Sequence, residues 1–167
     1  MSKLGDTLLI RQATLDDEPY IKKLLLEAFS NNDGLHLPFL PTERNVENFW
    51  TLEVRPLLLN SDPCLLAFDQ SNSIGLSCCS TLVSQAYDLE YKIASGVLTV
   101  ILQNYRNKGL ATIFHQKVLN MLRDLEVRSV ITDITDSNKP SFNSCMNIVK
   151  KLNLEYNIVS RKYECRI

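Results

Sequence analysis

The sequence predicts a mixed α/β fold, in one domain over residues 1–167, and three observations support this prediction. A chain of 167 residues has the usual size of a single domain. Apolar residues make up 45% of it, enough for a core without metal ions or disulfides. These residues alternate along the chain between short strand-like runs and segments of helical periodicity, with no repeat or linker between them.

The N-terminal part is predicted to contain one strand and two helices. The strand covers residues 8–11, and Thr14 is expected to cap the helix that follows. The apolar residues of this helix recur at the spacing of one buried face: Ile21, Leu24, Leu25, Ala28 and Phe29. Residues 30–41 contain a glycine and two prolines, which indicates a loop. Thr42 is expected to cap a second helix that ends near Pro56. One face of that helix is apolar: Val46, Phe49 and Trp50.

The remainder of the chain alternates strands with two longer helices. The predicted strands cover residues 64–69, 74–83, 94–102, 129–134 and 157–164. A long helix follows the third of these strands, and its apolar face comprises Leu110, Phe114, Val118, Met121, Leu122 and Leu125. A last helix is predicted over residues 141–152. The resulting order β-α-α-β-β-β-α-β-α-β favours a mixed sheet with helices packed on it.

The composition argues against several classes of function. The 18 Lys and Arg residues nearly balance 19 Asp and Glu residues, which argues against broad electrostatic binding to nucleic acid or to an acidic membrane. No apolar run is long enough to cross a bilayer, and residues 1–5 do not lead into the apolar core of a signal peptide. We therefore expect a cytoplasmic protein without nucleic-acid or membrane partners.

Metal, thiol and dinucleotide chemistry are disfavoured by residue spacing. The two histidines, His36 and His115, are far apart, which argues against a metal site or a Ser-His-Asp site. Cys78 and Cys79 are adjacent, a spacing that fits neither a CxxC redox site nor a zinc knuckle, so we expect buried, reduced thiols. The five glycines do not match GxGxxG or a P-loop, which excludes Rossmann dehydrogenases and P-loop NTPases.

The segment before the long helix has the chemistry of a phosphate site. A helix N-terminus exposes unpaired backbone N–H groups and the positive end of the helix dipole. Gly109 permits close approach of a ligand to the backbone, and Arg106 and Lys108 add positive charge. The same residues would also suit a solvated surface turn, so the local chemistry leaves both interpretations open.

Residues 101–111, with the sequence ILQNYRNKGLA, resemble motif A of the GCN5-related N-acetyltransferases. The residues that match the family pattern, in order, are Tyr105, Arg106, Lys108, Gly109, Leu110 and Ala111. Residues 9–17 are similar to the first strand and helix start of that family, and residues 138–141 with 150–154 to its Asn-x-x-Ser…Lys-Leu-Gly-Phe motif. The resemblance extends from about Leu8 to the C-terminus and is weakest in the region of the substrate loop.

The resemblance implies a mostly antiparallel sheet, flanked by about four helices, in which one splayed strand pair holds acetyl-CoA. One strand would contact the pantetheine arm, residues 106–112 would surround the pyrophosphate, and a third group would lie near the sulfur. The implied cofactor-binding residues are Val100, Ile101, Leu102, Arg106, Asn107, Lys108, Gly109, Leu110, Ala111, Thr112, Asn138, Ser141 and Phe142. An amine would attack the thioester directly, with a backbone N–H stabilising the oxyanion and with neither a metal ion nor a covalent enzyme intermediate.

The sequence departs from the family pattern at functionally relevant positions. Gln103 replaces the usual Pro, and Asn107 and Asn153 replace Gly, although Asn tolerates left-handed backbone angles. The tyrosine that often protonates the departing thiolate is missing. Counting from the two flanking motifs places either Cys145 or Val149 at that position, one helical turn apart. Cys145 is therefore the candidate catalytic acid, and the alternative is a buried apolar residue on the core face of the helix.

Several residues could act as the general base, and several classes of amine could be the acceptor. Asp88 and Glu90 precede the central strand, and Glu27 and Asp33 lie near the end of the first helix. Each suits a solvated surface carboxylate better than a general base, and ordered water is an alternative to all four. Because the net charge is close to zero, we expect a small-molecule amine as the first choice of acceptor and a protein or peptide amine as the second. The alternative from another functional class is a non-catalytic protein of this fold, which binds acyl-CoA or is a subunit of a larger assembly. A monomer and a homodimer are both compatible with the sequence.

Overall fold

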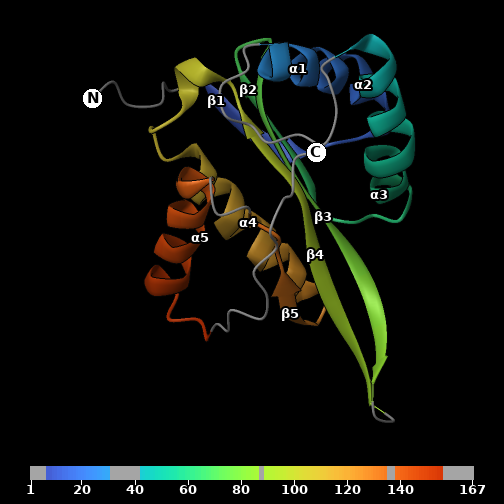
Figure 1. The fold of residues 1–167 in the computed structure, drawn as a ribbon, viewed down its shortest axis with the longest axis vertical. Helices are drawn as coiled ribbons and strands as arrows, with labels where there is room; N and C mark the ends of the chain where they lie inside the picture. The colour runs from blue at the N-terminus through green and yellow to red at the C-terminus, as the bar shows by residue number, and fades with distance from the viewer. Residues whose placement is uncertain (1–6, 31–41, 87–88, 135–137, 156–167) are drawn as a thin grey trace, which may run out of the picture.

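The computed structural model describes residues 7–30, 42–86, 89–134 and 138–155, and its centre is a five-stranded sheet with the order β1-β2-β3-β4-β5 (Figure 1). The strands span Leu8–Gln12 (β1), Cys64–Asp69 (β2), Asn72–Ala86 (β3), Leu89–Ile101 (β4) and Val127–Ile131 (β5). Strands β1 to β4 pair antiparallel with their neighbours, and β5 pairs parallel with β4. The sheet is therefore mixed and mostly antiparallel, as predicted.

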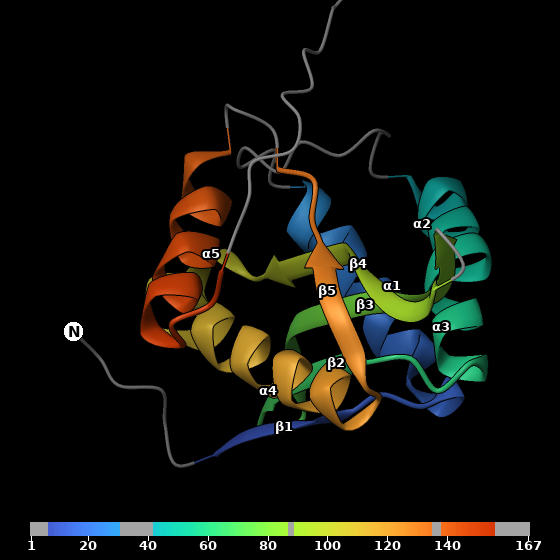
Figure 2. The same ribbon diagram turned by 90° about the horizontal axis from the view of Figure 1, so that it is seen from below.

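Helices cover both faces of this sheet (Figures 1 and 2). One face carries α1 (Glu18–Ser30), α2 (Glu43–Phe49) and α3 (Arg55–Leu59), while α4 (Leu110–Asp124) lies on the other face, beside α5 (Lys139–Lys151). The buried residues of α4 are Leu110, Phe114, Val118 and Leu122, which confirms the predicted apolar face. Among the described helices, none combines the length and apolarity required to span a bilayer.

Gly75 on β3 lets α4 pack closely against the sheet. A Cβ at this position would lie 2.9 Å from Cε2 of Phe114 and 3.3 Å from the backbone oxygen of Val100. Phe114 is completely buried, so its ring has little room to move away from a larger residue. The contact fixes the position of α4, and with it the position of the loop that precedes α4.

Residues Glu43–Leu59 form one helical rod with a π-helical turn, Trp50–Val54, between α2 and α3. The wide turn comes just before Pro56, which lies in the first turn of α3. Proline has no N–H to donate, and its ring clashes with the carbonyl four residues earlier, so a local widening of the helix relieves the contact. Trp50 and Val54 of this turn are buried, so the predicted core role of Trp50 is confirmed.

The predicted elements agree with the structure in type and differ at some boundaries. Strands β3 and β4 are longer than predicted because their polar ends pair with each other, from Gly75 opposite Ile101 to Ala86 opposite Leu89. Strand β5 starts and ends earlier than predicted, and α5 begins at Lys139 because Asn138 caps it. The strand predicted at 157–164 and the loop at 31–41 lie outside the described residues.

Candidate functional site

Strand β4 continues beyond the point where its pairing with β5 ends. Their pairing covers Lys92 to Ser95 on β4, opposite Val127 to Ile131 on β5. At Gly96 they are still close, since a Cβ there would lie 3.1 Å from Oγ1 of Thr132. Val97 then forms a bulge, because Cys78 and Cys79 of β3 face Leu98 and Gly96. A bulge bends the strand that carries it, so β4 leaves β5 here and its outer edge has no partner strand among the described residues.

The backbone groups on this outer edge belong to alternate residues of β4. The Leu102 N–H donates to the backbone oxygen of Ile74 on β3 (3.0 Å), and Val100 lies opposite Leu76 in the same register. Ile101 lies between these two residues and Thr99 precedes Val100, so both Thr99 and Ile101 direct their N–H and C=O groups away from β3. The oxygen of Ile101 accepts a hydrogen bond from Nε of Arg106 (2.9 Å), as expected for a carbonyl at an open edge.

The loop after β4 turns sharply before α4 begins. A short 3-10 turn, Gln103–Tyr105, is followed by two residues with left-handed backbone angles, Asn107 (φ 58°) and Gly109 (φ 88°). Asn is one of the few residues with a side chain that adopts this conformation at a modest steric cost. Gly109 is the N-cap of α4, and a Cβ on it would meet no atom within 4 Å. The space above this turn is open.

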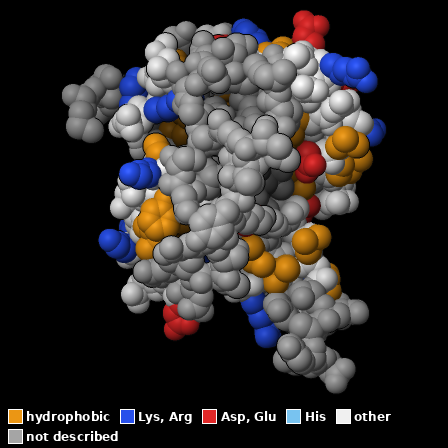
Figure 3. Space-filling model, viewed as in Figure 1, with side chains coloured by type: hydrophobic (Ala, Val, Ile, Leu, Met, Phe, Trp, Pro, Cys, Tyr) orange, Lys and Arg blue, Asp and Glu red, His pale blue; other side chains and the backbone are white. Residues whose placement is uncertain are grey.

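The first turn of α4 supplies backbone donors to that space. The Ile113 N–H donates to the oxygen of Gly109 (3.1 Å), which is the first bond of the helical ladder. The N–H groups of Leu110, Ala111 and Thr112 precede this bond and so have no acceptor within the helix. Together with the helix dipole and the side chains of Arg106 and Lys108, they form a surface complementary to phosphate. Figure 3 shows separate Lys and Arg side chains along the left edge of the view, on the side where α5 lies in Figure 1, and others at the upper right and below.

Tyr105 also connects the loop to the edge of the sheet. The sequence indicates this residue only as part of the motif. Its hydroxyl donates to Oδ2 of Asp69 (2.8 Å), at the end of β2. This bond raises the pKa of Tyr105. Hydrogen bonds from Thr7 and then from Tyr105 lower the pKa of Asp69, with a further contribution from the charge of Lys108.

The N-terminus of α5 contains the other predicted cofactor residues. The Asn138 side chain accepts a hydrogen bond from the Ser141 backbone N–H (3.2 Å), so the predicted Asn-x-x-Ser motif caps this helix. Phe142, in the next position, is 46% exposed. Cys145 is half-buried, and burial raises the pKa of its thiol. It follows Ser141 by one turn and precedes the buried Ile148, so these three residues share one side of the helix.

The predicted cofactor residues therefore divide into three groups. Residues 106–112 form the turn and the first turn of α4, and Asn138, Ser141 and Phe142 start α5. On β4, the backbone N–H of Leu102 is already bonded to β3, whereas Ile101 lies on the open edge. Thr99 shares this edge and was missed, because the register with β3 decides which residues of β4 face outward. Period-two alternation from Ile101 is the sequence signal that could have found it.

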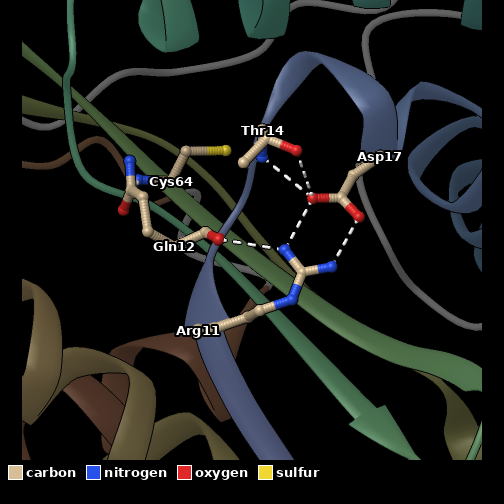
Figure 4. A network of polar contacts seen from close by, with 5 residues as sticks. All are labelled: Arg11, Gln12, Thr14, Asp17 and Cys64. Atoms are coloured by element: carbon tan, nitrogen blue, oxygen red, sulfur yellow. Dashed lines mark hydrogen bonds and ion pairs between the residues drawn. The ribbon is translucent and has the colours of Figure 1, made fainter.

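Among the four candidate bases, Glu27 lies on α1 with an exposed side chain. Asp33 and Asp88 lie outside them, and the side chain of Glu90 is not described. Asp17 is a buried carboxylate, but it lies at the junction of β1 and α1 (Figure 4). There it accepts two hydrogen bonds from Arg11 (2.7 Å each) and one from the Thr14 N–H (2.8 Å). Asp17 therefore closes the turn into α1 and is not available as a base.

Cys78 and Cys79 of the sheet and His115 lie in environments that favour their uncharged forms. Cys64, Cys78 and Cys79 are free and buried, which confirms the expectation of buried, reduced thiols for these three. Burial raises the pKa of Cys79 to about 11, so it carries no thiolate at neutral pH. Burial lowers the pKa of His115, which favours the neutral form of its imidazole. Within the described part of the chain, no group of His, Cys, Asp and Glu could hold a metal ion.

Comparison with known proteins identifies the fold. No protein-family model and no curated protein matches the sequence. An aminoglycoside acetyltransferase from an uncultured soil metagenomic sample, solved with sisomicin, is similar in structure: TM-score 0.64, 14% identity, 96% of this chain and 98% of that one covered. A GNAT family acetyltransferase from Staphylococcus aureus gives a TM-score of 0.62 at 14% identity, with 96% and 99% covered. A ribosomal-protein-alanine N-acetyltransferase from Brucella melitensis gives 0.64 at 17% identity, with 83% and 82% covered. The chain therefore has the fold of the GCN5-related N-acetyltransferases.

Proposed function

We propose that this protein, as one domain over residues 1–167, transfers an acetyl group from acetyl-CoA directly to an amine. The observation that carries the proposal is the position of two features next to each other: the open edge of β4 and the phosphate-complementary turn at the start of α4. The loop of residues 102–109 joins them. An elongated cofactor with a diphosphate at one end and an amide-containing arm at the other suits this pair of surfaces.

The residues of the site fit acetyl-CoA group by group. The N–H groups of Leu110, Ala111 and Thr112, with Arg106 and Lys108, would bind the pyrophosphate. The amides of the pantetheine arm would pair with the edge groups of Thr99 and Ile101, as an added strand pairs with a sheet edge. Phe142 and the N-terminal turn of α5 would lie beside the cofactor. The first two assignments rest on backbone geometry together with the sequence motif, and the third rests on the motif.

The transfer forms a C–N bond between the amine and the acetyl carbon and breaks the thioester C–S bond. Negative charge develops on the carbonyl oxygen, and an N–H on the open edge of β4 would stabilise it. The amine loses a proton and the departing thiolate gains one. Cys145 is the candidate donor, because burial raises the pKa of its thiol and keeps it protonated at neutral pH. Holding the two reactants together would supply much of the remaining rate enhancement.

A small-molecule amine is the proposed acceptor. The aminoglycoside acetyltransferase with a similar fold, solved with sisomicin, supports this choice. The ribosomal-protein-alanine N-acetyltransferase of the same fold favours a protein amine as the second candidate. A module that binds acyl-CoA without turnover is the third. We place the protein in the cytoplasm, in agreement with its composition.

Titration calorimetry with acetyl-CoA tests the first part of this proposal. We expect binding in the micromolar range, with CoA competing for the same site. Absence of both heat and thermal stabilisation at millimolar acetyl-CoA, in a protein shown to be folded, would contradict the proposal. An acetyl-CoA complex that shows no CoA release with any amine would favour the non-catalytic module.

A further inference from the structure

Three segments that are distant in sequence meet at the carboxylate of Asp69. Oδ1 of Asp69 accepts from the Thr7 hydroxyl (2.5 Å), just before β1, and Oδ2 accepts from the Tyr105 hydroxyl (2.8 Å), in the loop after β4. Asp69 itself ends β2 and lies opposite Leu8 in the sheet. The Tyr105 ring is partly buried and packs against the apolar cluster beneath α4. Tyr105 thus connects the loop to the rigid edge of the sheet.

The loop that Tyr105 anchors contains unfavourable backbone conformations. Asn107 and Gly109 are both left-handed, with φ of 58° and 88°, within three consecutive residues. A left-handed residue with a side chain persists only where the surrounding structure holds it. On the C-terminal side α4 provides that restraint, and on the N-terminal side the side chains of Tyr105 and Arg106 bond to the sheet. The hydroxyl of Tyr105 is therefore one of the anchors that keep the turn in its observed shape.

Tyr105 also contacts the positively charged side chain of Lys108. Its Nζ lies 5.2 Å from the centroid of the Tyr105 ring, within the range of a cation–π contact. The lysine is therefore held at the turn instead of extending freely into solvent. Because the ring is fixed by the bond to Asp69, the position of the ammonium group depends on that bond as well.

We propose that Tyr105 is a positioning residue, which through its hydrogen bond to Asp69 holds the turn at residues 106–109 and the Lys108 ammonium ready to bind the pyrophosphate. The proposal rests on the function proposed above and adds to it a residue that does not touch the cofactor. It predicts that loss of the Tyr105 hydroxyl weakens recognition of the diphosphate part of CoA and leaves recognition of the pantetheine arm unchanged.

The test compares Tyr105→Phe with wild type and with the matched control Tyr20→Phe. Tyr20 is a partly exposed tyrosine on α1, which packs on the opposite face of the sheet. Binding is measured with two probes: CoA, by calorimetry, and pantetheine, which lacks the diphosphate and the nucleotide, by ligand-observed NMR. We expect Tyr105→Phe to raise the Kd for CoA roughly 3- to 10-fold, as for the loss of one hydrogen bond, and to leave the Kd for pantetheine unchanged. Tyr20→Phe should alter neither value.

Two further measurements separate positioning from general loss of stability. In an Asp69→Ala background, Tyr105→Phe should have no additional effect on CoA binding, because the hydrogen bond is already absent. Amide hydrogen exchange at residues 106–112 of the free protein should be faster in Tyr105→Phe than in wild type. Equal Kd values for CoA in Tyr105→Phe and wild type, or an equal loss for CoA and pantetheine, would overturn the proposal. If wild type binds no CoA, the proposed function fails. Unchanged amide hydrogen exchange at residues 106–112 in Tyr105→Phe would contradict the role of Tyr105 in holding the turn, whatever the binding results.

Discussion

Substitution of Gly109 separates the contribution of the turn to folding from its contribution to cofactor binding. Gly109 has φ of 88°, and a Cβ on it meets no atom within 4 Å. Folding therefore opposes a side chain only through backbone strain, whereas a bound phosphate would compete with it for space. The pair Gly109→Ala and Gly109→Val shares the strain and differs in bulk, so Gly109→Ala is the matched control.

The expected magnitudes differ for the two properties. A left-handed residue with a side chain is destabilised by roughly 1–2 kcal/mol. For a chain of this size that lowers the Tm by about 2–8 °C in Gly109→Ala, and by somewhat more in the β-branched Gly109→Val. The valine methyl groups would stand over the N–H groups of the first turn of α4, which phosphate oxygens must approach to about 2.9 Å. We expect Gly109→Val to bind acetyl-CoA at least about tenfold more weakly than Gly109→Ala, or about 1.4 kcal/mol.

The assay combines thermal unfolding with calorimetric titration of acetyl-CoA for both variants and wild type. The temperature of the titrations is kept below the unfolding transition of the least stable variant. If the folded Gly109→Val protein binds acetyl-CoA as tightly as Gly109→Ala, the diphosphate does not approach the backbone at this turn. The cofactor assignment of residues 106–112 would then be wrong.

Three other substitutions test separate parts of the structure. Asp17→Asn should destabilise the fold by about 1.5–3 kcal/mol at pH 7. The hydrogen bond from Arg11 is the main cause of the lowered pKa of Asp17, so this stability is present above the unfolded pKa of about 3.9 and is lost as the pH falls through the folded pKa. The difference in urea unfolding between Asp17→Asn and wild type should therefore shrink as the pH is lowered below about 3.9. Gly75→Ala should lower the free energy of unfolding by roughly 1–3 kcal/mol, because the new methyl group contacts the Phe114 ring. Adding Phe114→Leu in the same chain should recover part of that loss, and full additivity of the two changes would refute the contact. Cys145→Ala should reduce turnover by about 10²–10⁴-fold with acetyl-CoA affinity retained if Cys145 is the proton donor, and near-normal turnover in Cys145→Ala and Cys145→Ser would exclude it.

Much of the fold could be predicted because its signals are local. The apolar face of α4 and the buried face of α1 follow helical periodicity, and Thr42 caps its helix with the expected side-chain hydrogen bond. The longer extent of β3 and β4 could not be predicted, since polar residues at their ends are held in the sheet by pairing with each other. The π-helical turn before Pro56 was missed because only the helix boundary is evident from a proline.

The candidate site was predicted in part, for a related physical reason. The turn from Arg106 to Thr112 is continuous in sequence, so its motif could be recognised and its left-handed residues assigned. The open edge of β4 depends on the bulge at Val97 and on the limited pairing with β5, which are properties of two strands together. The bond between Tyr105 and Asp69 joins residues 36 positions apart, and no local pattern indicates it.

The most direct test of the central claim is mass-spectrometric detection of acetylated product. Purified protein is incubated with acetyl-CoA and a panel of amines: aminoglycosides, amino sugars, polyamines, arylalkylamines and a peptide with a free N-terminus. The account predicts an amide product and an equal amount of free CoA with at least one small-molecule amine, at a rate well above the protein-free background. Binding of acetyl-CoA without product from any amine in the panel would contradict it.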